Sequence, residues 1–460
     1  MAAGQGKRMA SRLPKVLHPL AGRPLLSHVL TTARSIAPQT VAVVVGKDSA
    51  AVREFFSASL PNLLFVEQSP PRGTGDAVRV ALSALSAPAE ITLVMNGDCP
   101  LIASSSVREL CEAAKQGALA WLTTKTSSPQ GLGRIVRDAK GKVLAIVEER
   151  DANDAQKSID EINVGVLAAP TALLKRWVEQ LTCNNAQGEY YLTDVLAMAV
   201  RENVPVETVQ TDEISARGIN DRAQLADVER IVQRRQAQAL MLQGVTLADP
   251  ARFDLRGALR CGRDVRIDIG CVFEGEVVLG DEVEIGAHCV LRNVTLAEGV
   301  KVAPFSHLDG ATVGEQALIG PYARLRPGAK IAERAHVGNF VEIKASTLGA
   351  GSKANHLSYL GDAEIGANVN IGAGTITCNY DGVNKHKTTI KDGAFIGSNT
   401  ALVAPMTVGA GAVVGAGSTL SEDIEAQSLT FTRTRPIVKK NWPRPDSKVP
   451  DSKASTKKKD

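Results

Sequence analysis

An aliphatic side chain recurs at every sixth position along much of the chain between about 265 and 420. One uninterrupted series comprises Val313, Ile319, Leu325, Ile331, Val337 and Ile343, and another comprises Ile390, Ile396, Leu402, Val408, Val414 and Leu420. Repetition on this scale indicates a solenoid whose repeats stack on their neighbours. A period of six predicts a triangular parallel β-helix, in which three repeats of one short strand and one turn complete each coil.

Two local features add to this prediction. Cys271 and Cys289 are separated by one full coil of this period, and each stands two positions before an inward-pointing one. We therefore expect them to stack in adjacent coils as small core residues, in preference to a metal or redox role. The count of six breaks between Ile371 and Ile390, where the segment TCNYDGVNKHKT is inserted. An insertion in a solenoid projects as a loop from one face, often the face that binds ligands.

The segment 1–220 has a different pattern, in which short apolar runs alternate with helical segments. Buried strands are predicted at 41–46, 91–98 and 119–124, where the sequence reads VAVVVG, ITLVMNGD and LAWLTT, and helices are predicted at 76–85 and 106–114. Continuous apolar runs separated by helices indicate a mostly parallel sheet that is covered on both faces.

Residues 221–243 contain no Gly or Pro, and their apolar stripe is made up of Leu225, Val228, Val232 and Ala239. The other face is mostly charged or polar, as is typical of an amphipathic helix. We predict a linker helix here, between an α/β domain at 1–220 and a β-helix at 244–424. The last segment, 425–460, is rich in Lys, Pro and Ser, and we expect its basic tail to be disordered.

Charge and cysteine content exclude several classes of protein. The net charge is +4, but residues 437–460 contain eight Lys or Arg and three Asp or Glu, which leaves the rest of the chain near −1. The positive charge therefore belongs to the tail and not to a nucleic-acid-binding face. The seven cysteines form no CxxC pair, which argues against a zinc site or a disulfide framework. Because no apolar run approaches the ~20 residues of a membrane helix and the N-terminus is not a secretory signal, we expect a cytoplasmic protein.

The chain begins with MAAGQGKRMASRLPK. Its glycines and small alanines can form a turn whose backbone N–H groups approach a phosphate, and Arg8 and Lys15 supply positive charge nearby. A glycine-rich turn alone is weak evidence, because the same residues fit a simple connection between a strand and a helix. The LPK segment at this spacing favours phosphate binding.

The pattern AAGxGxRM…LPK resembles the signature of sugar-1-phosphate nucleotidyltransferases. The expected motifs follow in order: QSPPRGTGDA at 68–77, NGDCPL at 96–101, GLGRI at 131–135, IVEERDA at 146–152, EINVG at 161–165 and NNAQGEYYLTD at 184–194. With the hexapeptide repeats, residues 1–436 resemble the bacterial enzymes that combine N-acetylglucosamine-1-phosphate uridyltransferase with glucosamine-1-phosphate acetyltransferase. The resemblance implies an α/β Rossmann-like nucleotidyltransferase domain followed by a left-handed parallel β-helix.

The same resemblance implies the reactions. Acetyl-CoA acetylates glucosamine-1-phosphate, and UTP then transfers a uridylyl group to the product and releases pyrophosphate. The UDP-N-acetylglucosamine formed supplies peptidoglycan and lipopolysaccharide precursors. The implied partners are small-molecule substrates, with no nucleic acid and no membrane.

Uridylyl transfer brings an anionic sugar phosphate against UTP, so cations must offset the repulsion. Asp98 and Asn220 resemble ligands of Mg²⁺, which prefers oxygen, although Asp98 also fits a solvated turn at a strand end. The resemblance assigns the phosphate-binding turn to Ala2, Ala3, Gly4, Arg8 and Lys15, the uracil to Gln68, Gly73 and Thr74, and the sugar to Gly133, Glu148 and Asn163. Taken alone, Glu148 and Asn163 fit ordinary polar residues at strand ends.

The N-terminus departs from the family pattern. Family members have an apolar strand directly before AAG, whereas here Met1 stands where that strand should end. Because this strand would be central in the sheet and would anchor the phosphate-binding turn, we expect the natural protein to carry about ten more residues. Without the strand we expect uridylyl transfer to suffer and acetyl transfer to persist. Asn96 also replaces an aromatic residue that is frequent in the family.

Acetyl transfer requires a neutral amine, so a general base that titrates near neutrality helps, and histidine suits this role. His356, in GSKANHLSYLGD, matches the base of the family, although a lone histidine on a solenoid turn is usually a surface residue. His336 and His386 are not favoured, and we expect both to be polar surface residues.

The resemblance also implies the other contacts of this site. The phosphate is assigned to Arg326, Lys344 and Lys385, the sugar to Tyr359 and Asn370, the sugar and the tetrahedral oxyanion to Asn379 and Tyr380, and acetyl-CoA to Ala373, Ser398, Ala416 and Arg433. These residues spread over several coils, and the resemblance implies a homotrimer with sites between subunits.

Two other functions fit parts of the pattern. A nucleotidyltransferase-like domain joined to a β-helix fits a regulatory assembly subunit, but the intact Asp98, Lys15 and His356 argue against it. A single-activity pyrophosphorylase with a structural β-helix is the other alternative. Release of free thiol from acetyl-CoA in the presence of glucosamine-1-phosphate distinguishes the two-site enzyme from both alternatives.

Overall fold

The computed structural model describes residues 1–460 except 5, 61, 87–88, 434–435 and 443–460. The chain divides into two compact units, Met1–Pro327 and Gly328–Asp460. The disorder that we expect of the basic tail falls mostly on 443–460, which lie outside the described residues.

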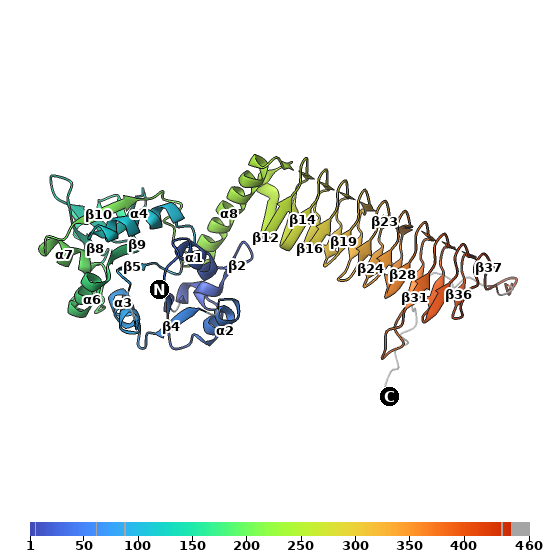
Figure 1. The fold of residues 1–460 in the computed structure, drawn as a ribbon, viewed down its shortest axis with the longest axis horizontal. Helices are drawn as coiled ribbons and strands as arrows, with labels where there is room; N and C mark the ends of the chain where they lie inside the picture. The colour runs from blue at the N-terminus through green and yellow to red at the C-terminus, as the bar shows by residue number, and fades with distance from the viewer. Residues whose placement is uncertain (5, 61, 87–88, 434–435, 443–460) are drawn as a thin grey trace, which may run out of the picture. The chain divides into compact units, whose positions relative to one another are not determined.

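The first unit opens with an α/β region (Figure 1). Its α-helices are α1 (Leu25–Arg34), α2 (Ala50–Ser59), α3 (Thr74–Ser83), α4 (Ser104–Lys115), α5 (Asp154–Lys157), α6 (Thr171–Gln180) and α7 (Asp194–Arg201). Its strands are β1 (Pro19–Leu20), β2 (Arg23–Pro24), β3 (Val41–Val45), β4 (Leu63–Glu67), β5 (Ile91–Val94), β6 (Leu119–Lys125), β7 (Arg134–Arg137), β8 (Val143–Val147), β9 (Glu161–Pro170) and β10 (Val206–Gln210). The three predicted strands correspond to β3, β5 and β6, and the two predicted helices to α3 and α4.

The main sheet is mixed, not mostly parallel as we expected. Its strands follow the order β10-β6-β9-β7-β8, and β5 pairs with the remaining part of β9. Strand β9 runs antiparallel to β5, β6 and β7, while β10 and β6 are parallel. An apolar run shows that a strand is buried but says nothing of its direction, which is why the sequence did not reveal the orientation of β9.

Strands β3 and β4 form a separate parallel pair. In the described part of the chain, no strand pairs with the other edge of β3 or the other edge of β5. The backbone of Met1 and Ala2 lies between them: Ala2 N–H donates to the Val44 carbonyl at 2.7 Å, and Gly97 N–H donates to the Met1 carbonyl at 2.8 Å. An apolar cavity of about 400 Å³ lies between β3, β5, α1 and α3.

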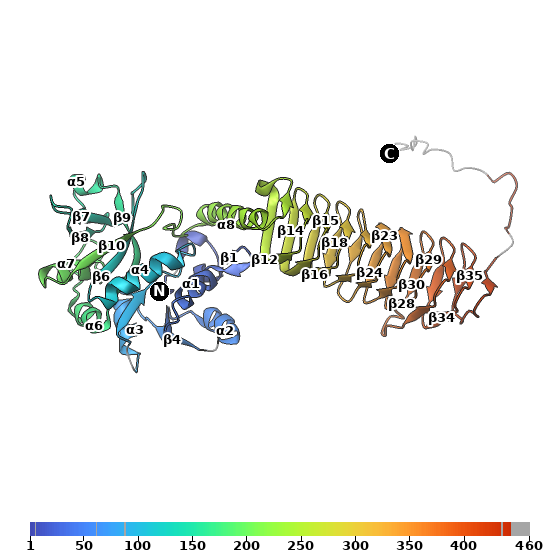
Figure 2. The ribbon, with the colours of Figure 1, turned by 45° about the horizontal axis from the view of Figure 1, so that its top comes forward.

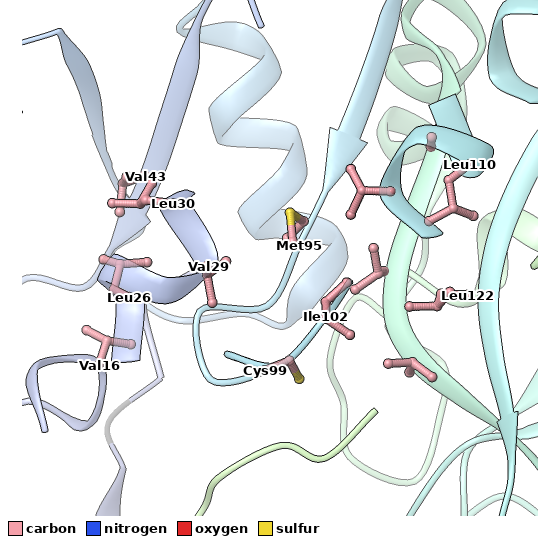
Figure 3. Close-up of a cluster of buried hydrophobic side chains, with 14 of the residues drawn as sticks. Val16, Leu26, Val29, Leu30, Val43, Met95, Cys99, Ile102, Leu110 and Leu122 are labelled. Carbon is pink, nitrogen blue, oxygen red and sulfur yellow. The ribbon is translucent and has the colours of Figure 1, made fainter. Parts of the chain in front are cut away.

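One hydrophobic cluster joins α1, β3, α4 and the turn after β5 (Figure 3). Val29 from α1, Val43 from β3 and Leu110 from α4 are buried in it. Met95 and Cys99, which bracket Asp98, belong to the same cluster. Burial of each large side chain stabilises the fold by roughly 1.5–3 kcal/mol, so this core fixes the turn that carries Asp98.

The predicted linker helix is α8, Arg222–Leu242, which is capped by Asp221 through a hydrogen bond from Gln224 N–H at 2.8 Å. Its buried residues are Val228, Gln233, Ala237 and Leu240, so the expected stripe is wrong at Ala239, which is exposed. The buried Gln233 exchanges hydrogen bonds with the backbone of Leu255, which explains why a polar residue occupies this face. No helix in the described ranges is long and apolar enough to cross a membrane.

The remainder of the first unit is a parallel β-helix. Its strands are β11 (Thr246–Leu247), β12 (Phe253–Cys261), β13 (Arg266–Ile267), β14 (Cys271–Leu279), β15 (Glu284–Ile285), β16 (Val290–Leu296), β17 (Lys301–Val302), β18 (His307–Asp309), β19 (Thr312–Val313), β20 (Leu318–Ile319) and β21 (Arg324–Leu325). Ile267 pairs with Ile285, and Ile285 pairs with Val302, so the inward positions of successive coils stack in register. Cys271 and Cys289 are fully buried in adjacent coils, as predicted, and burial raises their pKa values to about 11 and about 12.

The second unit has the same architecture, with short parallel strands stacked edge to edge (Figure 2). Its strands are β22 (Lys330–Ile331), β23 (His336–Asn339), β24 (Glu342–Lys344), β25 (Thr347–Leu348), β26 (Lys353–His356), β27 (Tyr359–Gly361), β28 (Ala363–Ile365), β29 (Asn370–Ile371), β30 (Ile376–Cys378), β31 (Thr388–Ile390), β32 (Phe395–Ile396), β33 (Ala401–Val403), β34 (Met406–Val408), β35 (Val413–Val414), β36 (Thr419–Leu420) and β37 (Leu429–Thr430).

The inserted segment and the end of the stack are the two features of the second unit whose positions were predicted. Ile371 pairs directly with Ile396, so the inserted segment is accommodated within one enlarged coil, between β30 and β31. Strand β37 pairs with β35, so the stack continues beyond 424, where we expected it to end.

Candidate active sites

A cavity of about 400 Å³ opens where β4 and β5 end in the first unit. The predicted site residues that line it are Ala2, Ala3, Gly4, Lys15, Gln68, Gly73, Thr74 and Asp98. They come from the N-terminal turn, the loop before α3 and the turn after β5. The carboxyl edge of the strands is where ligands bind in α/β folds.

Asp98 and Asn220 converge on one cation. Lys15 Nζ donates to Asp98 Oδ2 at 2.5 Å and to Asn220 Oδ1 at 3.0 Å. The chain on either side is fixed, because Ile219 N–H donates to the Asp98 carbonyl at 2.9 Å. A carboxylate oxygen and an amide oxygen that already share a positive charge form a donor set that suits Mg²⁺.

This pair would supply only part of a metal's coordination. Within the described residues, no group of three or more His, Cys, Asp or Glu side chains could hold a metal ion. Mg²⁺ is commonly bound through one or two protein oxygens, with the other positions taken by water and substrate phosphates. The residues therefore fit a metal that is shared with a nucleotide.

The loop before α3 brings backbone close to the cavity. Gly73 has φ +111°, and a Cβ at this position would lie 2.6 Å from the Tyr190 carbonyl oxygen. Only glycine fits this conformation and this approach. Thr74 begins α3, and its Oγ1 accepts a hydrogen bond from Leu192 N–H at 3.1 Å. The predicted uracil contacts thus lie on a loop held against Tyr190–Leu192.

The three predicted sugar contacts form a second group. Asn163 N–H donates to the Gly133 carbonyl at 2.8 Å, and a Cβ on Gly133 would lie 3.4 Å from Glu148 Oε2. Glu148 Oε1 accepts from Thr193 Oγ1 at 3.1 Å, and burial raises the pKa of Glu148. Asn163 Oδ1 accepts from Trp121 Nε1 and from Gly165 N–H. Among the described residues no hydrogen bond engages its amide nitrogen, which can therefore donate to a ligand.

Some cavity residues were not predicted, and five predicted residues do not line the cavity: Arg8, Gly133, Glu148, Asn163 and Asn220. Arg8 is exposed, lies in the short helical turn Lys7–Met9, and does not line the cavity. Glu189 and Asn96 line it without having been singled out as site residues. For Asn96 the sequence did contain a signal, because this residue replaces an aromatic residue that is frequent in the family.

In the second unit, His356 ends β26 and is exposed. Its partner in the preceding coil is Asn339, and His356 Nδ1 lies 2.7 Å from Asn339 Oδ1. With the amide oriented this way, Nδ1–H donates and Nε2 keeps its lone pair. A histidine in this tautomer can accept a proton from a substrate amine.

Asp362 lies at the centre of the predicted phosphate contacts of this unit. It accepts hydrogen bonds from Lys344 Nζ, at 3.1 Å to Oδ2 and 3.3 Å to Oδ1, and from Asn379 Nδ2. Burial raises the pKa of Asp362, but the hydrogen bonds from Asn379 and Lys344 and the charge of Lys385 lower it, and the net shift is downward. Asp362 was not singled out from the sequence.

The other predicted sugar and phosphate contacts of the β-helix lie on or next to β21, β27, β29 and the inserted loop. Tyr359 begins β27, and its hydroxyl would collide with a Cβ on Gly361, so glycine makes room for the ring. Tyr380 and Lys385 pair across the inserted loop, and Tyr380 Oη donates to the Gly382 carbonyl at 2.5 Å. Asn370 pairs with Lys353, one strand away from His356. Arg326 directly follows β21 in the first unit.

The two histidines that were not favoured as the general base are His386 and His336. His386 Nε2–H donates to Asp381 Oδ2 at 2.7 Å inside the inserted loop. His336 begins β23 and is half-buried, and burial, Lys353 and His356 lower its pKa.

The four residues predicted to bind acetyl-CoA form one column on successive coils. The Ala373 carbonyl accepts from Asn399 N–H at 2.7 Å, and the Ser398 carbonyl accepts from Gly417 N–H at 2.7 Å. Arg433 Nη1 donates to the Ala416 carbonyl at 2.6 Å, and its guanidinium lies 5.4 Å from the Phe431 ring centre. This column of small residues ends in a cation.

Both the α/β region and the β-helix are similar to known proteins. Residues 1–183 match the MobA-like NTP transferase domain, and residues 310–345 match six repeats of the bacterial transferase hexapeptide. The bifunctional protein GlmU of Bordetella parapertussis is 54% identical over 452 residues, covering 97% of this chain and 98% of the relative. The bifunctional protein GlmU of Azoarcus sp. is 53% identical over 446 residues, with the same coverage. A crystal structure of apo UDP-glucose pyrophosphorylase covers 51% of this chain and 97% of its own, with TM-score 0.42 and 14% identity.

Proposed function

We propose a function on the premise that the chain belongs to the family of bifunctional GlmU proteins, to which it is similar over nearly its whole length. It is an enzyme with uridyltransferase and glucosamine-1-phosphate acetyltransferase activities in UDP-N-acetylglucosamine synthesis. A regulatory subunit or a single-activity pyrophosphorylase does not fit this family. The assignment of individual residues below is our proposal.

The cavity of the first unit is the proposed uridyl-transfer site. The N-terminal turn and Lys15 bind the phosphates of UTP, and the loop from Gln68 to Thr74 binds the uracil. Gly133, Glu148 and Asn163 bind the sugar of N-acetylglucosamine-1-phosphate. A phosphate oxygen of N-acetylglucosamine-1-phosphate attacks the α-phosphorus of UTP. The bond from the α-phosphorus to the oxygen that bridges it to the β-phosphate breaks, so that pyrophosphate leaves.

Asp98 and Asn220 are the proposed ligands of Mg²⁺. When bound, the metal supplies positive charge against the phosphates of both substrates. The support for this assignment is that both side-chain oxygens accept from the Lys15 ammonium, at 2.5 and 3.0 Å. Lys15 itself orients phosphate oxygens through its three donors.

The β-helix carries the proposed acetyl-transfer residues. His356 Nε2 takes a proton from the amine of glucosamine-1-phosphate as the nitrogen attacks the thioester carbonyl of acetyl-CoA. Asn379 and Tyr380 orient the sugar and stabilise the oxyanion, and coenzyme A leaves as the thiol. Arg326, Lys344 and Lys385 bind the phosphate, Tyr359 and Asn370 bind the sugar, and the column from Ala373 to Arg433 binds acetyl-CoA.

We further propose a division of the chain into 1–220 for uridyl transfer, 221–243 as linker, and a β-helix for acetyl transfer that begins at 244 and extends beyond 424 to include β37. We propose that the working form is a cytoplasmic homotrimer. The spread of the acetyl-transfer residues over several coils supports sites that are completed by a neighbouring subunit.

The observation that carries the two-site proposal is the hydrogen bond of 2.7 Å between His356 Nδ1 and Asn339 Oδ1, because it leaves Nε2 as a base in a unit without the nucleotide cavity. The test compares His356→Ala with Asp98→Ala, following thiol release from acetyl-CoA and pyrophosphate release from UTP. We expect His356→Ala to abolish thiol release and spare pyrophosphate release, and Asp98→Ala to do the reverse. Loss of both activities in either folded variant contradicts separate sites.

A further inference from the structure

Gln68 is held by two hydrogen bonds that fix the orientation of its amide. The residue follows β4, lines the nucleotide cavity and has only 4% of its surface exposed. Its Nε2 group donates to the Gly73 carbonyl oxygen at 3.0 Å and to Asp76 Oδ2 at 2.9 Å. Neither a carbonyl nor a carboxylate can donate a hydrogen, so the amide nitrogen must face these two acceptors.

Asp76 is itself held in place. It lies in the first turn of α3 with 5% of its surface exposed, and its other oxygen, Oδ1, accepts from Arg79 Nη2. The Arg79 guanidinium lies 5.3 Å from the centre of the Tyr190 ring. The contacts therefore run from Tyr190 through Arg79 and Asp76 to Gln68.

Both hydrogens of the Gln68 amide are used by these bonds, and its oxygen is not. Within the described part of the chain, no hydrogen bond reaches Gln68 Oε1. A pyrimidine that meets this oxygen is distinguished by its N3 position. Uracil carries a hydrogen on N3 and can donate to Oε1, whereas N3 of cytosine is an acceptor and would meet a second lone pair.

We propose that Asp76 is a specificity-determining positioning residue, which holds the Gln68 amide so that Oε1 selects a uracil N3–H and disfavours cytosine. This inference rests on the proposed uridyl-transfer function of the cavity. Asp76 does not touch the base. Without it, one of the two interactions that oppose an amide flip is lost, and a flipped amide would offer N–H to cytosine.

The test compares UTP with CTP in the full-length chain. We expect Asp76→Ala to lower the ratio of kcat/KM for UTP to that for CTP by about 10- to 100-fold, because a hydrogen bond is lost to one base and gained by the other. Equilibrium binding of UTP and CTP, measured by calorimetry, should change in the same ratio. Glu67→Ala removes a charge at an exposed neighbouring position and should leave the ratio unchanged.

A double-mutant comparison separates positioning from a general structural effect. In a Gln68→Ala background, Asp76→Ala should cause no further change in the ratio, since Asp76 acts through the amide. Equal losses for UTP and CTP in Asp76→Ala, or a further change of the ratio without Gln68, would overturn the proposal. If Asp76→Ala fails to fold, Asp76→Leu replaces it, because leucine has a similar size and offers no acceptor to the amide, and the same loss of preference is expected. Asp76→Asn, whose oxygen can still accept from Gln68, should preserve the preference for UTP.

Failure of the underlying function gives a different result. A parent chain that binds neither nucleotide and releases no pyrophosphate contradicts uridyl transfer at this cavity. A parent chain that uses UTP while Asp76→Ala keeps its full preference contradicts the role of Asp76 alone. Thiol release at the acetyl-transfer site and the thermal unfolding midpoint report that each variant is folded.

Discussion

Lys15 Nζ donates a hydrogen bond of 2.5 Å to Asp98 Oδ2, so an ammonium group already occupies the oxygen that we propose as a metal ligand. A divalent metal that binds Asp98 in the absence of nucleotide competes with this contact for the charge of the carboxylate. UTP removes the conflict by offering phosphate oxygens to Lys15. The two cations are therefore expected to share the site only when nucleotide is present.

The first prediction concerns this competition. Lys15→Met should raise the affinity of the nucleotide-free chain for Mn²⁺ about fivefold, since an ion pair of this kind is worth ~1 kcal/mol. Paramagnetic resonance of unbound Mn²⁺ measures this directly. The same variant should lose roughly 10²-fold in uridylyl transfer, because a cation that stabilises the transition state is gone. Lys115→Met, a surface change of equal charge, is the control, and an unchanged Mn²⁺ affinity in Lys15→Met would show that the ammonium does not compete.

The second prediction concerns Asn339, whose amide oxygen accepts from His356 Nδ1 at 2.7 Å. Asn339→Leu should lower kcat for acetyl transfer about 10- to 100-fold, because the ring loses the contact that orients it. Asn339→Asp restores an acceptor and adds a negative charge that favours the imidazolium, so the acidic limb of the pH–rate profile should move to higher pH. Uridylyl transfer should be unaffected in both. A profile that does not move in Asn339→Asp argues against a direct contact with the base.

The third prediction concerns Asp362, which accepts from Lys344 and Asn379. Asp362→Ala should raise KM for glucosamine-1-phosphate about tenfold, because Lys344 is no longer held and must be ordered by the substrate. Asp362→Asn keeps an acceptor and removes the negative charge near the phosphate, so its KM should be equal to or lower than that of the parent. Initial rates of thiol release measure both. A lower KM in Asp362→Ala would show that repulsion outweighs positioning.

The fourth prediction is a pH dependence of stability. Burial raises the pKa of Glu148 above its usual value of 4.5, so ionising this carboxyl costs stability in the folded state. Glu148→Gln should therefore raise the unfolding midpoint near pH 7. The gain should shrink as the pH falls through the raised pKa and vanish below 4.5, where the carboxyl is protonated in both states. Thermal unfolding of both chains between pH 4 and pH 8 tests this, and a gain that grows on acidification would contradict it.

Much of the architecture could be predicted because periodicity reports directly on burial. The recurrence at every sixth position placed Ile267, Ile285 and Val302 on inward positions, and all three are buried and paired in register. The composition of 221–243 likewise predicted α8 almost to the residue. The direction of β9 could not be predicted, since a strand buried on both faces has the same apolar pattern in either direction.

Asp98 and Gln68 could be proposed as site residues because a motif surrounds each of them, and both line the cavity of the first unit. Asp76, which accepts from Gln68, and Asp362, which accepts from Lys344 and Asn379, were missed because sequence spacing does not reveal these contacts. Asp98 and Asn220 are distant from each other in the sequence, and only the fold brings both within reach of Lys15.

The sequence by itself determined the stacked coils, the linker helix and the residue types at each site, since these depend on local periodicity and on chemistry. The tertiary structure alone decided strand direction in the α/β sheet, which oxygens converge on Lys15, and which way the amides of Gln68 and Asn339 face. The physical reason is that hydrogen bonds are directional and join residues distant in the chain. Their geometry is therefore set by packing and not by sequence spacing.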